Sequence, residues 1–380
     1  MKRVIILLMT SVFGITGNSA AWDTDQINIH GFISQGFLIT DHNDFYYADT
    51  RDGTFQFNEA GISFASELTD NLRIGVQLLS RDLGDIGNNE MTVDWAFGDY
   101  RYRNWLGIRA GKIKRPFGLY NRFRDIDAAR TSIFLPLMVY DDIPRETYLA
   151  TTGVGIYGYL PGRISYELQY GTVQMDTDGG SARNMEALSL NPISDIEADE
   201  SYTAYAEWET PLEGLTLAGT LFDYPDTKAK IPLGEMEFTA KFYLASAEYL
   251  HGNLSLAAEY RYVPYKYIVN DRFTLRDQTG ESWYASVSYR LTDWLTMGTY
   301  YGELYVNKDD KGGKGAETVG LPRASMWRKD LALTTRFDIS KNWIFKLEGH
   351  MMNGLAQVTS PLNEASENWF LFAAKMTFTF

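Results

Sequence analysis

The charged residues best placed to act on solutes gather in one stretch, from Arg109 to Arg130, which reads RAGKIKRPFGLYNRFRDIDAAR. An apolar run from Ile133 to Tyr140 follows it, and further charges come directly after that run. Opposed charges held across a narrow gap create a transverse field, which orients polar solutes and excludes apolar ones. The chemistry expected here is therefore selection among ions and polar molecules, provided that the fold arranges these charges around a passage.

The candidate selectivity residues combine this stretch with two arginines of an earlier segment. They are Arg73, Arg81, Arg109, Lys112, Lys114, Arg122, Arg124, Asp125, Asp127, Arg130, Asp141 and Asp142. The alternative interpretation is that part of this set forms salt bridges that fix the segment to a neighbouring wall.

Other kinds of chemistry find little support in the sequence. The chain has no cysteine, which excludes cysteine catalysis and thiolate metal sites. The four histidines, His30, His42, His251 and His350, are scattered without metal-ligand spacing, so neither a metal nor a cofactor is expected. The acidic connection that contains Asp176, Asp178 and Glu186 could bind a divalent cation or bridge lipopolysaccharide, but such a run is more often a solvated loop.

The elements that must position the candidates are β-strands, because apolar and polar residues alternate with period two. We expect strands near 26–40, 54–67, 71–82, 90–101, 104–115, 150–160, 163–173, 201–210, 213–223, 236–250, 253–267, 281–291, 294–305, 327–339, 342–353 and 368–380. Recurrent tryptophans near strand ends, such as Trp105, Trp294 and Trp369, indicate an interfacial girdle. The facing of the first two strands is left open.

The connections alternate between two kinds along the whole chain. Short ones are rich in turn formers, for example Pro161-Gly162 and His251-Gly252-Asn253. Long polar ones lie near 41–53, 83–89, 116–149, 174–200, 224–235, 268–280, 306–326 and 354–367. Short turns at one rim and long loops at the other are typical of the two ends of a transmembrane barrel, with both termini at the short-turn rim.

The last strand, Asn368 to Phe380, has a uniformly apolar face that runs from Phe370 to Phe380. Its alternating aromatics and terminal phenylalanine resemble the C-terminal signature of bacterial outer-membrane β-barrels. The resemblance implies that Phe378 and Phe380 are read by the barrel assembly machinery of that membrane.

The N-terminus has the parts of a secretory signal peptide, 1–21, with Lys2 and Arg3 before an apolar stretch and small residues at the cleavage site. That stretch is shorter than the roughly 20 apolar residues that a membrane helix needs. The formal net charge of −14 argues against nucleic-acid binding. We expect residues 22–380 to form one domain, an all-β, transmembrane, antiparallel, up-and-down barrel of about sixteen strands.

The connection 116–149 carries more large apolar residues than a loop surrounded by water would, so we expect it to fold into the barrel. It resembles the third loop of sixteen-stranded porins, which narrows the pore. The phrase from Gly111 to Gly118, GKIKRPFG, is similar to a strand-end motif of phosphate-selective-type and related proteobacterial porins. The resemblance implies a homotrimeric, non-enzymatic outer-membrane porin, in contact with lipid and lipopolysaccharide, that passes ions and small hydrophilic solutes.

Two alternatives remain open. One is a substrate-specific channel of the anion or phosphate type, although acidic and basic lumen candidates nearly balance and form no arginine ladder. The other is a barrel enzyme such as a phospholipase, for which the sequence has no serine–histidine or aspartate–histidine motif. The sign of the ion selectivity is not decided by these residues.

Overall fold

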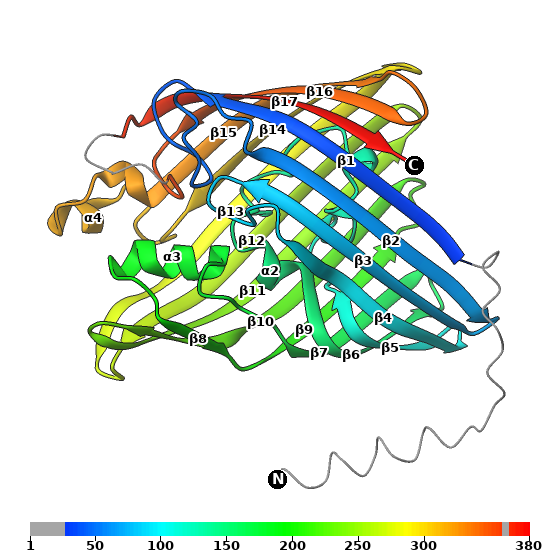
Figure 1. Ribbon diagram of the computed structural model, residues 1–380, viewed down its shortest axis with the longest axis horizontal. Helices are drawn as coiled ribbons and strands as arrows, with labels where there is room; N and C mark the ends of the chain where they lie inside the picture. The colour runs from blue at the N-terminus through cyan, green and yellow to red at the C-terminus, as the bar shows by residue number, and fades with distance from the viewer. Residues whose placement is uncertain (1–26, 359–364) are drawn as a thin grey trace, which may run out of the picture.

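The computed structural model describes residues 27–358 and 365–380, which form a closed antiparallel β-barrel (Figure 1). The strands are β1 (Ile27–Thr40), β2 (Phe57–Thr69), β3 (Leu72–Leu83), β4 (Met91–Arg103), β5 (Leu106–Lys114), β6 (Ala150–Leu160), β7 (Ile164–Thr172), β8 (Asp195–Ala198), β9 (Glu200–Glu209), β10 (Leu215–Ile231), β11 (Gly234–His251), β12 (Leu254–Val269), β13 (Phe273–Thr292), β14 (Leu295–Tyr305), β15 (Trp327–Asp338), β16 (Trp343–Asn353) and β17 (Asn368–Thr379). The signal peptide expected at 1–21 lies outside the described residues.

Each strand pairs with its neighbours in sequence, and β17 returns to pair with β1, from Thr40↔Leu371 to Phe32↔Thr379. The short β8 and the following β9 are separated by Asp199 and both pair with β10, so together they count as one interrupted strand of the barrel. With β8 and β9 counted as one, the described residues form a barrel of sixteen strands, as the sequence predicts. No described helix is long and apolar enough to cross a membrane.

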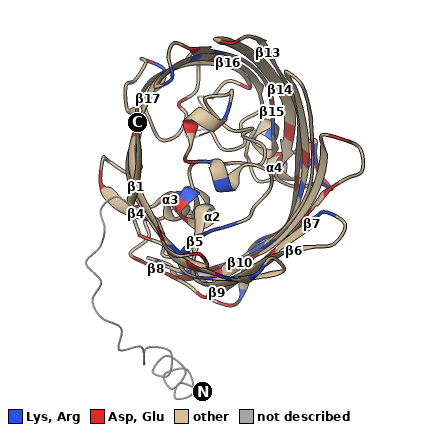
Figure 2. Ribbon diagram, turned by 90° about the vertical axis from the view of Figure 1, so that its right-hand side faces the viewer, with Lys and Arg blue, Asp and Glu red and all other residues tan. Residues whose placement is uncertain are grey.

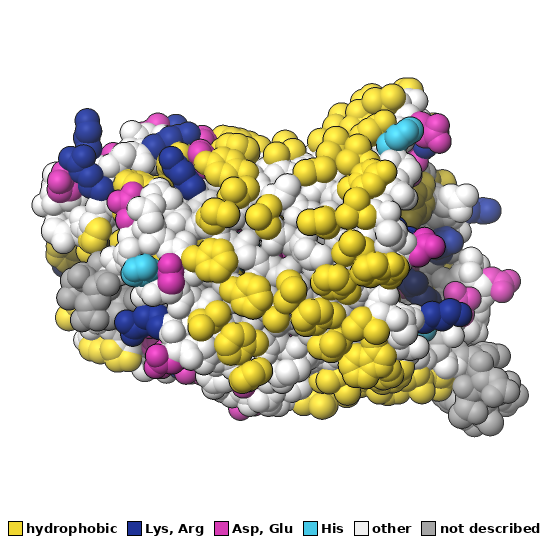
Figure 3. Space-filling model, turned by 90° about the horizontal axis from the view of Figure 1, so that it is seen from above, with side chains coloured by type: hydrophobic (Ala, Val, Ile, Leu, Met, Phe, Trp, Pro, Cys, Tyr) yellow, Lys and Arg dark blue, Asp and Glu magenta, His cyan; other side chains and the backbone are white. Residues whose placement is uncertain are grey.

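The alternation in the sequence sets the two faces of the wall. On β17, Trp369, Leu371, Ala373, Lys375 and Thr377 are buried, whereas the intervening side chains are more exposed. Figure 3 shows the result on the outside of the barrel, where hydrophobic side chains cover the middle and charged ones lie towards the two ends. An apolar outer band between polar rims is what a hydrocarbon layer requires.

The first two strands, whose facing the sequence leaves open, follow the same rule. Ile29 and Ile33 of β1 are more than half exposed, whereas Ser34, Leu38 and Thr40 on the other parity are buried. Glu59 of β2 pairs in register with Ser34 and so lies on the inner face.

Two of the expected long connections are wrong. The segments near 224–235 and 268–280 are mostly strand, because β10 to β13 run on and join through short turns at 232–233 and 270–272. Gly234, Asn270 and Asp271 adopt positive φ angles at these turns. Charged residues such as Lys228, Lys230 and Glu235 suggest loops, but they lie on the exposed face of extended β-hairpins whose other face, with Ala229, Ile231 and Met236, is buried.

The predicted girdle is correct for Trp105 and Trp294, which are about half exposed, but wrong for Trp369. Trp369 is 4% exposed and faces inward, where its indole nitrogen donates to the carbonyl of Gly354 at 3.1 Å. Its parity on β17 places it inward, and this outweighs its position at a strand end.

Two apolar clusters lie inside the barrel. The first joins Phe45 and Tyr46 of the first long connection to Phe134 and Met138 and to the inner side chains of β17. The second joins Phe117, Leu135 and Tyr140 to aromatic side chains of β10 and β11, such as Phe222 and Phe242. Figure 2, viewed along the barrel from the end where the chain finishes, shows chain segments within the ring of strands.

Candidate functional site

The segment between β5 and β6 holds most of the candidate selectivity residues. It contains the short 3₁₀ turns η2 (Asn121–Phe123) and η3 (Asp127–Ala129) and the helix α2 (Arg145–Leu149). The side chains of its apolar run 133–140 are nearly all inaccessible to water, for example Met138 at 0% and Tyr140 at 1% exposure. The segment packs on inward-facing wall residues, and three buried carboxylates hold it there.

The first carboxylate is Glu348 of β16, which meets the start of the apolar run. The backbone nitrogens of Ile133 and Phe134 donate to its two oxygens at 2.7 and 3.1 Å. Thr334 and His350 also bind Glu348, at 2.7 and 3.0 Å. Two otherwise unpaired backbone donors are thereby satisfied within the barrel.

The second carboxylate is Asp127 of the segment itself. It lies 3.1 Å from Lys346 and 3.5 Å from Lys375, and it accepts a hydrogen bond from Thr377 at 2.8 Å. Burial alone would raise the pKa of Asp127, but the charges of Lys346, Lys375 and Arg130 lower it far below its ordinary value. Asp127 therefore stays ionised and ties the segment to β16 and β17.

The third carboxylate is Glu259 of β12, which receives only neutral donors. They are the backbone nitrogen of Leu119 at 3.0 Å and the hydroxyls of Tyr140, Ser246 and Tyr284 at 2.5, 2.6 and 2.7 Å. Four hydrogen bonds to one buried carboxylate fix both ends of the segment against β11 to β13.

The opposite wall, from β3 to β7, is polar. Arg145 of α2 forms a two-pronged pair with Asp94 of β4 at 2.6 and 3.0 Å. Gln77 of β3 bridges Asp94 and Asp125 at 3.0 and 2.7 Å. Lys114 then lies 2.6 Å from Asp125, whose pKa burial would raise but Lys114 lowers.

The chain of contacts continues towards the short-turn rim. Gln169 of β7 donates to the carbonyl of Lys114 and to Glu167, at 2.7 and 2.8 Å. Arg109 joins Glu167 to Asp99 at 3.2 Å each. Arg73 binds Asp99 at 3.0 Å and is half exposed. We call this connected set the polar seam. In order of contact it comprises Arg145, Asp94, Gln77, Asp125, Lys114, Gln169, Glu167, Arg109, Asp99 and Arg73.

The predicted residues thus divide into two groups. The side chains of Arg73, Arg109 and Arg122 are 48%, 23% and 34% exposed and can meet solutes. The side chains of Asp125, Asp127 and Arg124 are at most 3% exposed and lie in ion pairs. The alternative interpretation, in which charges fix the segment to the wall, therefore describes this second group.

The remaining candidates hold the end of the segment. Arg81 donates to the carbonyl of Asp142 at 3.2 Å, and Arg124 pairs with the carboxylate of Asp142 at 2.8 Å. Arg130 lies 3.6 Å from Asp127, and Asp141 accepts from the backbone nitrogen of Ile143 at 2.9 Å. Lys112 donates to the carbonyl of Val93 at 2.6 Å.

The candidate set omits several residues that complete these contacts, namely Glu59, Gln77, Asp94, Arg145, Lys346 and Lys375. Strand parity places most of them on the inner face. Their partners lie far away in the sequence, however, so alternation alone does not identify the pairs.

The two expected assembly residues lie at the closure of the barrel. The ring of Phe378 lies 4.9 Å from that of Trp343, centre to centre. The backbone of Phe380 exchanges two hydrogen bonds with Gly31, at 3.0 and 3.1 Å. A Cβ at Gly31 would come within 2.3 Å of the Phe380 ring, so a larger residue there would displace that ring.

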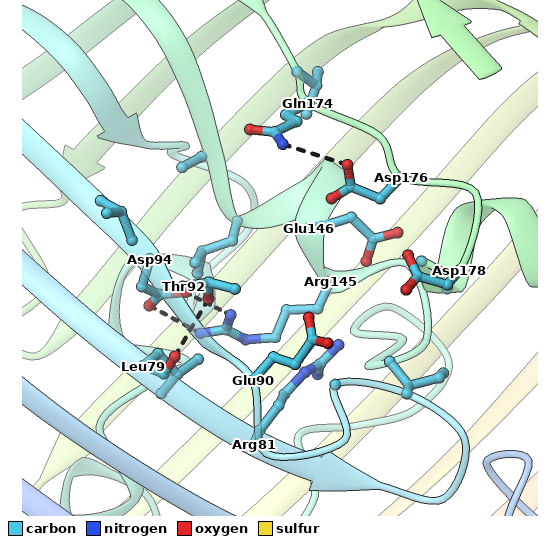
Figure 4. Close-up of a pocket in the computed structure, with 18 of the residues that line it drawn as sticks. Leu79, Arg81, Glu90, Thr92, Asp94, Arg145, Glu146, Gln174, Asp176 and Asp178 are labelled. Atoms are coloured by element: carbon cyan, nitrogen blue, oxygen red, sulfur yellow. Dashed lines mark hydrogen bonds and ion pairs between the residues drawn. The ribbon is translucent and has the colours of Figure 1, made fainter. Parts of the chain in front are cut away.

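A cavity of about 440 Å³ opens above the polar seam, beside the Arg145–Asp94 pair (Figure 4). Its charged lining comprises Arg81, Lys112 and Arg145 together with Glu90, Asp94, Glu146, Asp176 and Asp178. A second cavity, of about 510 Å³, lies on the other side of the lumen between Leu119, Phe123 and Leu135 of the segment and serines of β12 and β13.

No family model and no curated protein sequence matches this chain. Solved structures do resemble it. The anion-selective porin from Comamonas acidovorans has a TM-score of 0.60 and 11% identity over 93% of this chain and 99% of the porin. The Salmonella typhi OmpF complex with daunomycin has a TM-score of 0.60 and 13% identity over 93% and 97%.

A third similar structure is OmpT, an outer-membrane protein of Vibrio cholerae, with a TM-score of 0.59 and 11% identity over 95% of this chain and 100% of OmpT. At such low identities the likeness concerns the backbone alone. The chain has the closed sixteen-stranded barrel fold found in outer-membrane porins.

Proposed function

We propose that this protein is an outer-membrane porin that passes ions and small hydrophilic solutes by passive diffusion, with the segment 116–149 narrowing its channel. The observation that carries the proposal is the contrast between the two faces of one closed wall. The outer face carries an apolar band, and the inner face carries half-exposed arginines and paired carboxylates. A wall with these faces suits a lipid exterior and a wet lumen.

The location and the partners belong to the same proposal. The N-terminal signal directs export, Phe378 and Phe380 engage the barrel assembly machinery, and the mature barrel lies in the outer membrane among lipid and lipopolysaccharide. We propose a homotrimer, in keeping with one similar structure, OmpT of Vibrio cholerae, that is described as a trimer form.

We propose a channel rather than an enzyme. In the described residues His350 is bound by Asp330, Glu348 and Tyr300, and it is completely buried. A histidine held in this way orients a wall contact and meets no solute, so it does not favour hydrolytic chemistry.

The deciding experiment is a planar-bilayer recording of the purified, full-length protein under a salt gradient. The expected result is stable single-channel openings, with steps in groups of three if the trimer inserts as a unit. The reversal potential then gives the sign of the ion selectivity. A correctly folded barrel that carries no current would contradict the proposal.

A further inference from the structure

One side of the lumen is closed by apolar packing. Phe134, Leu137 and Met138 are at most 1% exposed and pack against inner side chains of β1, β14, β16 and β17. Leu135, Val139 and Tyr140 are at most 3% exposed and pack against inner side chains of β10 to β13. We call this part of the lumen the sealed side. A polar solute crossing it would have to be dehydrated and to separate close-packed side chains.

The other side of the lumen is bounded by the polar seam. Each of its residues is bound to the next by a hydrogen bond or ion pair, and its four basic and four acidic side chains are linked directly or through Gln77 and Gln169. Its basic side chains become more exposed along it, from 8% for Arg145 through 17% for Lys114 and 23% for Arg109 to 48% for Arg73, whereas its carboxylates are at most 6% exposed. The short-turn end of the seam is therefore wet, and its far end is shut.

Beside Arg145 and Asp94, at the buried end of the polar seam, β4 and β5 of the barrel wall move apart. β4 pairs with β5 only from Ala96↔Lys112 onwards, so residues 91–95 of β4 have no partner on their β5 side. The cavity of about 440 Å³ lies where the two strands part, and its lining includes the Arg145–Asp94 pair. Figure 4 shows Arg145 reaching from α2 to Asp94, with Glu90, Glu146 and Asp176 around them.

We infer that solutes cross this barrel off its axis, entering by the cavity between β4 and β5 and following the polar seam, and that the Arg145–Asp94 pair is the gate on this route. The inference rests on the proposed channel function and specifies its path. Opening the gate requires α2 to release Asp94, which exchanges one buried ion pair for contacts with water and solute. A buried pair that loses one partner is costly, so the gate stays shut unless both groups find replacements.

The path can be tested by thiol labelling, because the chain contains no cysteine and each introduced thiol is unique. Thr92→Cys places a thiol in the entrance cavity, at an exposed position on β4. Ser286→Cys places one in the cavity beneath the sealed side. A charged, water-soluble methanethiosulfonate reagent is added during single-channel recording of each full-length variant.

The expected result is a stepwise fall of the current in Thr92→Cys and an unchanged current in Ser286→Cys, with labelling of both confirmed by mass spectrometry. Equal block at both positions, or block at Ser286→Cys alone, would overturn the off-axis path. A wild-type barrel that never conducts would refute the channel function itself, so the two failures are distinguishable.

The gate is tested with the double variant Asp94→Asn/Arg145→Gln, which removes both charges and leaves no buried ion unpaired. Conductance is expected to rise about twofold or more, since pore-lining charges and constrictions set the barrier to ions. The control is Asp195→Asn/Lys230→Gln, which removes an exposed pair 2.6 Å apart on the face of β10 opposite the buried Ala229 and Ile231 and should leave conductance unchanged. Unchanged conductance in the first variant, with its barrel folded, would overturn the gate.

Discussion

The two sides of the lumen hold the same segment in different ways. The sealed side combines apolar side chains with carboxylates that anchor the segment, and Glu259 there accepts hydrogen bonds from neutral donors alone. The polar seam consists mainly of charged side chains, each bound to the next residue of the seam. Apolar packing resists water over its whole area, whereas an ion pair can exchange its partner for water or a solute ion. The apolar side of the segment therefore keeps water and solutes out, whereas the side at the polar seam can open to let ions and polar solutes pass.

The strongest way to abolish this difference is to delete Arg122 to Tyr140. Single-channel conductance should rise severalfold and ion selectivity should weaken, because both the apolar seal and the charged edge of the passage are lost. Conductance and reversal potential in a planar bilayer provide the measurement. Unchanged conductance would show that this segment does not bound the passage.

A single change can loosen the sealed side. Asp127→Ala leaves Lys346 and Lys375 buried without their shared counter-ion, and breaking such a cluster costs about 3–5 kcal/mol. Urea unfolding in lipid vesicles should show that loss. Asp195→Ala, which removes an exposed partner of Lys230, is the matched control and should cost at most about 1 kcal/mol.

The pH dependence of the same anchor follows from the sign of its pKa shift. The folded pKa of Asp127 lies below that of the unfolded chain, so its stabilisation is complete above the unfolded pKa of about 3.9. The stabilisation disappears as the pH falls from there towards the folded pKa. We expect the difference in the free energy of unfolding between wild type and Asp127→Asn to be fully present at pH 5 and to become smaller below about pH 4. A difference that already declines between pH 7 and pH 5 would contradict this assignment.

Glu259→Gln should have a smaller effect, about 1–3 kcal/mol, because the four donors around Glu259 are neutral and an amide oxygen can still accept from some of them. Urea unfolding gives the value. A cost as large as that of Asp127→Ala would mean that the neutral anchor matters as much as the ionic one.

The smallest effect is expected beside the polar seam. Arg122→Gln removes a partly exposed charge whose nearest carboxylate, Glu167, is 3.9 Å away. Conductance and stability should hardly change, while the reversal potential shifts towards cation preference. An unchanged reversal potential would place Arg122 away from the ion path.

The fold follows from the sequence because strand facing is a local property. Parity alone sorts Phe370 and Trp369 onto opposite faces of β17, and short turns mark where each hairpin reverses. The extended hairpins from β10 to β13 are not recognised, since closely spaced charged residues such as Lys228 and Lys230 resemble those of a loop.

The candidate site is predicted only in part. The composition of the segment identifies Asp127 as a candidate, but its partners Lys346 and Lys375 lie more than two hundred residues away. Lys375 belongs to a strand that is otherwise notable for its aromatics. Which charges meet depends on the closure of the barrel, and this is a property of the whole chain.

That closure also constrains how the protein is made. Gly31 near the beginning of the chain is hydrogen-bonded to the terminal residue Phe380, and Asp127 in the interior is hydrogen-bonded to Thr377 of the last strand. The interior segment and the closure of the barrel therefore depend on the same strand, β17. Contacts so distant in sequence form late and slowly. A truncation that removes Thr377 to Phe380 therefore takes away both the hydrogen bonds to Gly31 that help to close the barrel and the Thr377 anchor of the interior segment.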